Sequence, residues 1–375
     1  MRDFKKKQEH NHHLGGIQVK RSKKLVIAML VASLLLLLTA CGGSATTSGT
    51  NESANGSSSN AAEDKGSATG FGKHTIKVAN YYADDHPQNI ALKEVFKPMI
   101  EEKTGGAIKV DIFPNSQIGN EEAFSEGVRN GTIEMAVFGT ILSATEPKIG
   151  VTDMPFLIRD YEHAKQVFNG EVGDEIGDAY RKLGIEPLAW SANGFRVVSS
   201  SKPLYSIDDF KGLRLRMPNV PVYIEIGKAL HANVSPMPIS EVFTALESNV
   251  IDAQENPYAT LRASGWYEVQ DYVLESYHLF GVAMLGINQQ FWNGLNAEAK
   301  EVIQEAAKET AEYEWKLHEE QDEETKQYLT EQGLEIIVPD EDFKKAMHEA
   351  VEPVYEEYLK KYDWAEELIE KIRNQ

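Results

Sequence analysis

The stretch Lys211–Asn219 places two arginines on one face of a predicted β-strand. In its Leu-Arg-Leu-Arg-Met core, apolar residues alternate with Arg214 and Arg216, which is the period of two that a strand produces. Pro218 lacks a backbone N–H, so the strand is expected to end there, with Arg216 at its carboxyl end. Open α/β sheets usually bind ligands at that end, and a guanidinium binds a carboxylate through two parallel hydrogen bonds. Arg216 is therefore a candidate anion-binding residue. The alternative is a surface arginine paired with a nearby carboxylate, and we interpret Arg214, nearer the strand start, as structural.

The elements that must position these residues alternate between strand and helix. The predicted strands of a first block are 75–79, 107–113, 133–138 and 186–192. After Asn193-Gly194 the alternation restarts, with strands at 196–199, 213–217, 233–236 and 250–254. Strands that alternate with helices predict an α/β fold with a mainly parallel sheet covered on both faces. Two such blocks in series predict two lobes, with Arg196 at their junction and Asn256 just after the last of these strands.

A long segment without helix breakers follows Asn296. Asn296 is a plausible N-cap and Gly333 a plausible residue just after the helix end. A helix between them would be roughly 54 Å long at about 1.5 Å per residue. That length exceeds the width expected of one lobe, so the helix is predicted to brace both.

The charge of the chain excludes one class of partner. Its formal net charge is −20, from 38 basic and 58 acidic side chains. Eight of the basic residues and two of the acidic ones lie within residues 1–40, so residues 41–375 carry a net charge of −26. Such a chain repels phosphate backbones, and nucleic acid is not expected as a partner. Arginines that gather in one place are correspondingly informative.

The N-terminal segment predicts export and membrane anchoring. Residues 25–40 form a short apolar run behind the basic stretch Lys20–Lys24, which is typical of a signal peptide rather than of a membrane-spanning helix. Leu38-Thr-Ala-Cys41 resembles the lipobox of bacterial lipoproteins, which implies cleavage before Cys41 and lipidation of its thiol. The alternative is an uncleaved anchor. Residues 41–73 are rich in Gly, Ser, Ala and Thr and are predicted to form a flexible tether.

No metal site or cofactor is predicted. Cys41 is the one cysteine, so the chain can form neither an intrachain disulfide nor a cysteine-based metal site. His10, His12 and His13 have ligand-like spacing, but they lie in the segment expected to be removed.

Five separated motifs, together with the Lys211–Asn219 stretch, resemble the extracytoplasmic solute-binding proteins of TRAP transporters (DctP family). The five are Asn115–Gly119, Asp153–Leu157, Asn193–Arg196, Pro236–Leu246 and Ile251–Pro257. The resemblance implies a periplasmic-binding-protein-like fold of two lobes joined by hinge strands and a long helix that spans both. Lobe I is expected at 74–194 with a return segment at about 282–320. Lobe II is expected at 195–281 with C-terminal helices at about 321–375.

The resemblance also implies a set of ligand-binding residues. Arg216 matches the arginine that binds the ligand carboxylate, and Arg196 matches a second arginine near it, with a hinge salt bridge as the alternative. Asn256 matches an asparagine that hydrogen-bonds the ligand, and Asn80 a polar residue of the opposite lobe. Two other residues, His86 and Glu255, are candidates for lining the cleft. The alternative for both is a capping or hinge contact.

The implied function is capture of an organic acid anion for a TRAP-type permease, without enzymatic activity. The ligand could be a C4-dicarboxylate, a 2-oxo acid or a sugar acid. Sialate is disfavoured, because Gly139-Thr140 and Ile239 replace an acidic residue and an aromatic one of sialate-binding members. Two alternatives stay open: a lipid-anchored extracytoplasmic enzyme acting on a small organic acid, and a ligand-sensing module for a membrane receptor. Against the enzyme, the sequence contains none of the common nucleophile, P-loop or zinc-protease motifs.

Overall fold

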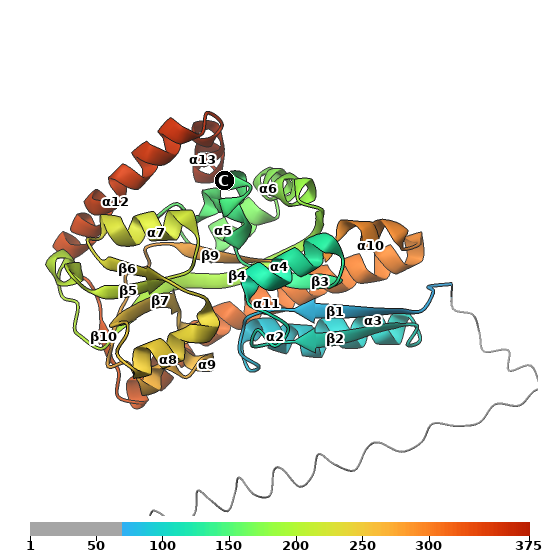
Figure 1. Cartoon of the computed structure of the whole chain (residues 1–375), viewed down its shortest axis with the longest axis horizontal. Coiled ribbons are helices and arrows are strands. Elements are labelled where there is room, and N and C mark those ends of the chain that lie inside the picture. The colour runs from blue at the N-terminus through green and yellow to red at the C-terminus, as the bar shows by residue number, and fades with distance from the viewer. Residues whose placement is uncertain (1–69) are drawn as a thin grey trace, which may run out of the picture. The chain divides into compact units, whose positions relative to one another are not determined.

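The structure is a computed structural model that describes residues 70–375 (Figure 1). The predicted signal peptide, Cys41 and residues 42–69 of the predicted tether lie outside the described residues. Within 70–375, no helix combines the length and the apolar character needed to cross a bilayer.

Within the described residues, ten strands form one mixed sheet. Its order is β2-β1-β3-β9-β4-β7-β5-β6, and β8 joins β10 to β4. β1 is parallel to β2 and β3, and β5 is parallel to β6 and β7, whereas β4 and β9 are antiparallel to their neighbours. The strands are β1 (His74–Ala79), β2 (Ile108–Phe113), β3 (Met135–Phe138), β4 (Ile185–Ser200), β5 (Arg214–Met217), β6 (Asn233–Pro236), β7 (Ala253–Pro257), β8 (Tyr272–Leu274), β9 (Phe280–Asn288) and β10 (Glu335–Ile337).

Helices connect most of the strands and cover the sheet. In chain order the α-helices are α2 (Pro87–Ala91), α3 (Lys97–Lys103), α4 (Glu121–Asn130), α5 (Tyr161–Phe168), α6 (Glu171–Lys182), α7 (Pro221–Ala229), α8 (Val242–Glu247), α9 (Tyr258–Ala263), α10 (Gln289–Gly294), α11 (Ala297–Glu331), α12 (Glu341–Lys361) and α13 (Ala365–Arg373). The tighter or wider helical turns are η1 (Leu92–Phe96), η2 (Ile141–Ala144), η3 (Pro147–Asp153), η4 (Ile207–Phe210), η5 (Ile239–Glu241) and η6 (Trp266–Glu268).

The sheet is buried on both faces in lobe I, which comprises β1–β3 and the helices around them. Met135 and Val137 of β3 pack with α3 and α11 residues in one apolar cluster. Ala136 and Phe138 point the other way and pack in a second cluster with α4 and α6 residues. Successive residues of a strand face opposite sides, and both sides of β3 are buried. All four residues of β3, Met-Ala-Val-Phe, are accordingly apolar.

Two antiparallel strands, β4 and β9, join lobe I to lobe II, which comprises β5–β7 and α7–α9. β4 pairs with β9 over Ile185–Phe195 and then with β7 over Arg196–Ser200. The prediction of two separate strands at 186–192 and 196–199 was therefore wrong. A register shift at Ala192/Gly194 bends the strand instead of ending it, and Gly194 has a φ of +103° that glycine adopts without steric penalty.

The predicted long helix is confirmed as α11. The Asn296 side chain caps it by accepting a hydrogen bond from the Ala299 N–H at 2.8 Å, and Gly333 follows its end with a φ of +102°. Its 35 residues span roughly 53 Å. The helix contacts α2 and α3 in lobe I and α9 in lobe II, so it braces both lobes.

The C-terminal helices are shared between the lobes. α12 packs against α7 and η4 of lobe II, whereas α13 packs against α6 and η3 of lobe I. The Tyr355 and Tyr358 hydroxyls of α12 also donate to the carbonyls of Pro155 (2.7 Å) and Pro147 (2.9 Å) on the lobe I side. α12 was expected to pack on lobe II. It does so, and it also contacts lobe I, so it bridges both lobes.

Candidate functional site

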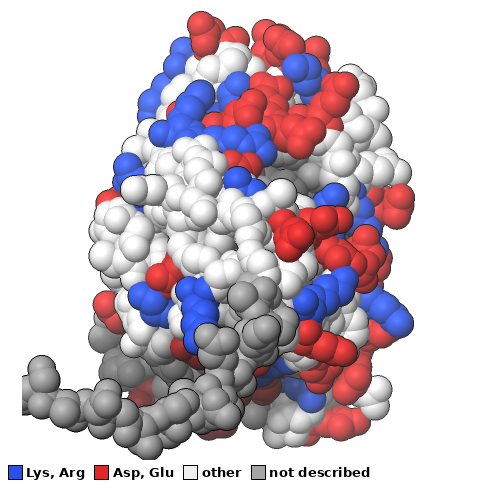
Figure 2. All heavy atoms as spheres, turned by 90° about the vertical axis from the view of Figure 1, so that its right-hand side faces the viewer, with Lys and Arg blue, Asp and Glu red and all other residues white. Residues whose placement is uncertain are grey.

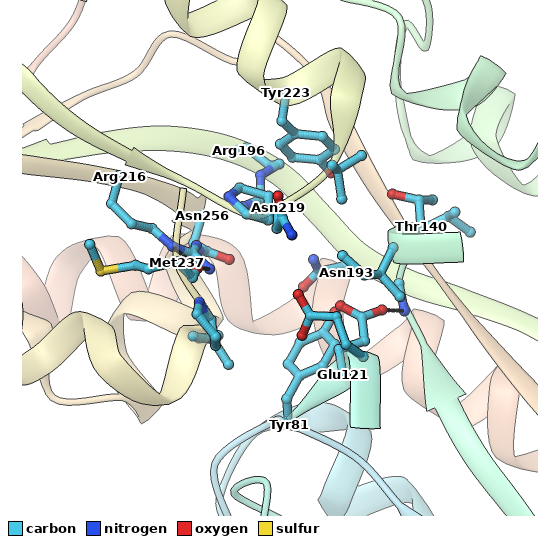
Figure 3. A pocket seen from close by; sticks show the side chains of 18 residues that line it. Tyr81, Glu121, Thr140, Asn193, Arg196, Arg216, Asn219, Tyr223, Met237 and Asn256 are labelled. Atoms are coloured by element: carbon cyan, nitrogen blue, oxygen red, sulfur yellow. Dashed lines mark hydrogen bonds between the residues drawn. The ribbon is translucent and has the colours of Figure 1, made fainter. Parts of the chain in front are cut away.

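A cavity lies between the lobes, at the carboxyl ends of their parallel strands (Figure 3). It encloses about 610 Å³ of atom-free space, part of it open to solvent. Its polar lining residues come from lobe I (Tyr81, Glu121, Glu122, Thr140), from β4 (Asn193, Arg196) and from lobe II (Arg216, Asn219, Tyr223, Asn256).

Arg216 lies in this cavity, at the end of β5 as predicted from the sequence. Its side chain is only 3% exposed. Nε and Nη2 both donate to the Met237 carbonyl, at 3.0 and 2.7 Å. Within residues 70–375 the guanidinium forms no ion pair with a carboxylate, and Nη1 makes no hydrogen bond. Burial lowers the pKa of Arg216 to about 10, and the nearby Arg196 charge acts in the same direction. Arg216 is thus a buried cation that an anionic ligand could neutralise.

Arg196 also lines the cavity, but its charge is already paired. Its Nη2 donates to Oε1 of Glu255 at 2.8 Å and to the Glu255 carbonyl at 2.7 Å, and Nε donates to the other carboxylate oxygen. Burial disfavours the charged form of Arg196, but the Glu255 carboxylate raises its pKa above the ordinary value. The guanidinium carbon lies 5.1 Å from the centre of the Tyr223 ring. The sequence left two roles open for Arg196, a ligand contact and a hinge salt bridge. The structure shows the salt bridge, and Arg196 also lines the cavity, so it can have both roles.

Arg214 does not line the cavity and is paired within the protein, which fits the structural role interpreted from the sequence. Its Nη2 and Nε donate to the two oxygens of Asp252, at 2.6 and 3.0 Å. Asp252 belongs to the segment that precedes β7, so the pair fixes β5 to its neighbour. Hydrogen bonds from Arg214, together with Lys202, lower the pKa of Asp252.

Asn256 is buried at the end of β7 and lines the cavity close to Arg216 (Figure 3). Its amide nitrogen donates to Oε1 of Gln254 at 2.8 Å. That hydrogen bond uses a donor of the amide, so the carbonyl oxygen of the side chain can accept from a ligand hydroxyl.

Glu255, Asn80 and His86 lie outside the cavity lining. Glu255 lies behind Arg196 and is fully buried. The Asn80 side chain bonds Asn89 and the Tyr82 N–H and so fixes the turn after β1. His86 caps α2, and its Nε2 lies 3.2 Å from the Thr260 hydroxyl of lobe II. In this structure, protein groups occupy polar atoms of all three side chains, which hold the lobes and the loops.

Sequence reasoning missed a carboxyl group that lines the cavity from lobe I. Glu121 opens α4, directly after the N-cap Asn120, and its Oε1 accepts from the Gly139 N–H at 2.7 Å. Burial raises the pKa of Glu121 to about 8, although that hydrogen bond favours the charged form. Acidic residues are ordinary in a first helical turn, where they favour the helix dipole. The signal available was its place two residues after the Asn115–Gly119 motif.

Asn193 and two tyrosines were also missed as cavity residues. Asn193 is buried, and its Oδ1 has no hydrogen-bond partner within the described residues. Tyr81 follows the end of β1, and Tyr223 lies on α7 (Figure 3). Asn193 belongs to a motif that the sequence singled out, whereas nothing distinguished these tyrosines from core aromatics. In residues 70–375 there is no cluster of three or more His, Cys, Asp or Glu suited to a metal ion.

The arrangement suits a small anion that also carries hydrogen-bonding groups. Arg216, Arg196 and Asn256 gather on one side of the cavity, and Glu121 and Tyr81 lie on the other (Figure 3). A carboxylate can pair with the guanidinium side. Ligand hydroxyl groups can form hydrogen bonds with Glu121 whether its carboxyl group is protonated or ionised, because a hydroxyl can both donate and accept.

Comparison with known proteins agrees with this geometry. Residues 78–361 match the family model described as bacterial extracellular solute-binding protein, family 7 (DctP). A TRAP periplasmic solute-binding protein of Haemophilus influenzae, solved with bound L-gulonate, is 44% identical with a TM-score of 0.79, and the match covers 80% of this chain and 99% of that one. The 2,3-diketo-L-gulonate-binding periplasmic protein YiaO of Escherichia coli is 35% identical over 67% of this chain and 76% of its own length. The C4-dicarboxylate-binding protein DctB of Bacillus subtilis is 30% identical over 76% of this chain and 81% of its own length. The chain belongs to family 7 of the bacterial extracellular solute-binding proteins and has the two-lobed fold of the TRAP periplasmic binding proteins.

Proposed function

We propose that this protein captures a sugar acid outside the cytoplasm and delivers it to a TRAP-type permease. The observation that carries the proposal is the buried Arg216 guanidinium, which has no carboxylate partner within residues 70–375. An unpaired buried charge is costly, and a ligand carboxylate would remove that cost.

The electrostatics of the rest of the chain support a local anion site. The protein is strongly acidic, and acidic side chains form several patches on the face shown in Figure 2. The overall field therefore repels anions. An anionic ligand has to be attracted by fixed donors at short range, and a desolvated guanidinium provides these.

Glu121 favours a sugar acid over a C4-dicarboxylate. It lines the lobe I side of the cavity, opposite the arginines (Figure 3). A second carboxylate of the ligand would lie beside Glu121 there. It would be tolerated only while Glu121 keeps its proton, below its pKa of about 8, and would be repelled above that pH. A polyhydroxylated monocarboxylate has no such conflict, and the relative that holds L-gulonate binds an acid of this kind.

The site residues and partners follow from the same proposal. Arg216 binds the carboxylate bidentately, Arg196 contributes its remaining donor, and Asn256 accepts from a ligand hydroxyl. Asn80, His86 and Glu255 support the cleft without touching the ligand. A lipid on Cys41 holds the mature protein at the cell membrane, near the permease subunits. The protein binds and releases its ligand unchanged and is not an enzyme.

A thermal-shift screen of the mature protein tests the ligand class. The acids are L-gulonate, D-galacturonate, D-glucuronate, succinate, L-malate and pyruvate. A ligand at a hundredfold excess over its Kd stabilises the folded state by about 2.7 kcal/mol. We expect the sugar acids to raise the Tm most. A larger shift with succinate or L-malate would contradict the sugar-acid class, and conversion of any of these acids would contradict the binding role.

A further inference from the structure

The strand β4 bends next to the cavity, at the point where it passes from one lobe to the other. The bend is the register shift between Ala192 and Gly194. Asn193 lies between these two residues and lines the cavity, and Arg196 follows a few residues later. The backbone at the bend therefore decides where two ligand-facing side chains point.

The long helix α11 passes behind this bend and contributes a buried carboxylate. Glu314 is 1% exposed, and its Oε2 accepts a hydrogen bond from the Ala192 N–H at 2.8 Å. A bulge removes backbone groups from the regular strand ladder, so they need other partners. The Glu314 carboxylate, which does not line the cavity, provides such a partner for the Ala192 N–H.

A histidine one turn along α11 completes the contact. His318 is fully buried, and its Nδ1 lies 2.9 Å from Oε1 of Glu314. A Cβ atom on Gly194 would come within 2.9 Å of the His318 ring, so the ring packs directly on the glycine. Glu314 and His318 together contact the bend on both sides of Asn193.

Contacts from both lobes converge on the same place. Gln88 of α2 donates to the Ala192 carbonyl and to the Ser191 hydroxyl, both at 2.8 Å. The His86 ring lies 5.7 Å from that of His318 and reaches Thr260 of lobe II. The bend is therefore contacted directly by α2 of lobe I and by α11, and the His86 ring connects these contacts to lobe II.

Burying a carboxylate here is costly, which argues that its position matters. Burial raises the pKa of Glu314, and the contacts with His318 and with the Ala192 N–H only partly offset that effect. An apolar side chain of similar size would avoid the cost, but it would leave the Ala192 N–H and the His318 ring without a partner.

We propose that Glu314, with His318, is a positioning residue that sets the direction of Asn193 at the ligand. Asn193 has an unpaired, buried Oδ1 within the described residues, and we assign it as a ligand contact that accepts from a hydroxyl group. The inference depends on the proposed function, because it concerns how the same cavity binds its sugar acid.

The test is a double-mutant cycle measured by calorimetric titration with L-gulonate, or with D-galacturonate where that binds more tightly. Glu314→Leu keeps the volume but removes the acceptor, and we expect it to weaken binding about tenfold or more. Glu314→Gln keeps an acceptor for the Ala192 N–H and should bind within about threefold of wild type. Glu309→Gln, an exposed change on the same helix, is the matched control.

The cycle separates positioning from general loosening of the fold. In an Asn193→Ala background, the loss caused by Glu314→Leu should shrink to less than about threefold, because its effect passes through Asn193. In an Arg216→Lys background, on another strand, it should keep its full size. Equal losses in both backgrounds, or wild-type binding by Glu314→Leu, would overturn the inference.

A second variant covers a failure of Glu314→Leu to fold. His318→Asn keeps a donor for Glu314 and removes the ring that packs on Gly194, and it enters the same cycle with the same expectations. If the wild type binds none of the acids, the proposed function itself fails. Binding by the wild type with an additive cycle rejects only the positioning role.

Discussion

The Arg196 guanidinium and the Glu255 carboxylate form a buried side-by-side pair, with Nη2 and Oε1 2.8 Å apart. Arg216, the second buried arginine of the cavity, has only the Met237 carbonyl as a partner within residues 70–375. The two arginines therefore differ in their pairing. The protein itself neutralises Arg196, whereas under the proposed function an incoming anion neutralises Arg216.

Replacing Arg216 should weaken ligand binding without unfolding the protein. Lysine is a compact point charge and loses the bidentate geometry, so Arg216→Lys should cost at least tenfold in affinity, about 1.4 kcal/mol. Arg216→Ala should cost more, whereas Arg214→Ala, on the same strand, should change affinity little. Calorimetric titration with the best acid of the screen measures all three. The assignment fails if Arg214→Ala abolishes binding while Arg216→Ala retains it.

Replacing Arg196 should instead destabilise the unliganded protein. Arg196→Ala leaves the Glu255 carboxylate buried without its main partner, and breaking such a pair costs about 3–5 kcal/mol. Urea unfolding without ligand measures the loss. Arg216→Ala is the matched control and should change the free energy of unfolding much less. Similar losses for the two variants would mean that the pairing difference has no energetic consequence.

The pH dependence of stability should report on Glu121. Its folded-state pKa of about 8 lies above the ordinary value of 4.5, so between these values the folded state holds a proton that the unfolded state has lost. The free energy of unfolding without ligand should therefore fall as the pH rises from about 4.5 to about 8. Asp153, whose pKa burial raises to about 7, adds to the same slope.

Glu121→Gln should make this slope shallower without abolishing it, because Asp153 remains. Glu126→Gln, on the exposed face of the same helix, is the control and should leave the slope unchanged. Denaturant unfolding at a series of pH values is the measurement. An unchanged slope in Glu121→Gln would show that Glu121 titrates normally.

Changing Cys41 to Ala should alter processing and location. The basic stretch, the apolar run and Leu-Thr-Ala-Cys predict a mature protein that begins at a lipidated Cys41. Cys41→Ala should leave the protein unprocessed or release it from the membrane fraction. Fractionation and gel mobility identical to those of wild type would reject the lipoprotein prediction.

Ligand binding should make the protein more compact. Two lobes joined by β4, β9 and α11 are suited to hinge closure around a bound anion. Small-angle scattering should give a smaller radius of gyration with the ligand than without it. Arg216→Ala at the same ligand concentration serves as the control and should not compact. A tight ligand that leaves the radius of gyration of the wild type unchanged would contradict a closing cleft.

The sequence predicted the larger elements because their signals are local. Alternating apolar residues and a following proline identified β5, and a long run without Gly or Pro identified α11. The continuity of β4 was not predictable in this way. Asn193-Gly194 is a common turn signal, and only the pairing with β9 on one side and with β7 on the other shows that the strand bends there and continues.

A site residue could be predicted from the sequence only where a side chain suited to binding an anion also lies at the predicted carboxyl end of a strand. Arg216 met both conditions. The pairing of Arg196 with Glu255 depends on the register that sets Val198 opposite Glu255 and Arg196 opposite Pro257, which no local pattern specifies. Glu121 and Glu314 look like ordinary helix-surface acids in sequence. They are functional candidates only because tertiary packing buries them.

Under the proposed function, we expect the two helices that bridge the lobes to limit how quickly a ligand can leave. If the lobes part by rotation, α11 can bend as a unit, but α12 has to separate from one lobe. Its contacts with the lobe I side include the hydrogen bonds of Tyr355 and Tyr358 to two backbone carbonyls, each worth about 1 kcal/mol. These hydroxyls are far more easily released than the apolar packing of α12 on α7. We therefore expect Tyr355 and Tyr358, which lie outside the cavity lining, to govern how long the ligand stays bound. That time would limit how often each protein molecule can bind and release a ligand.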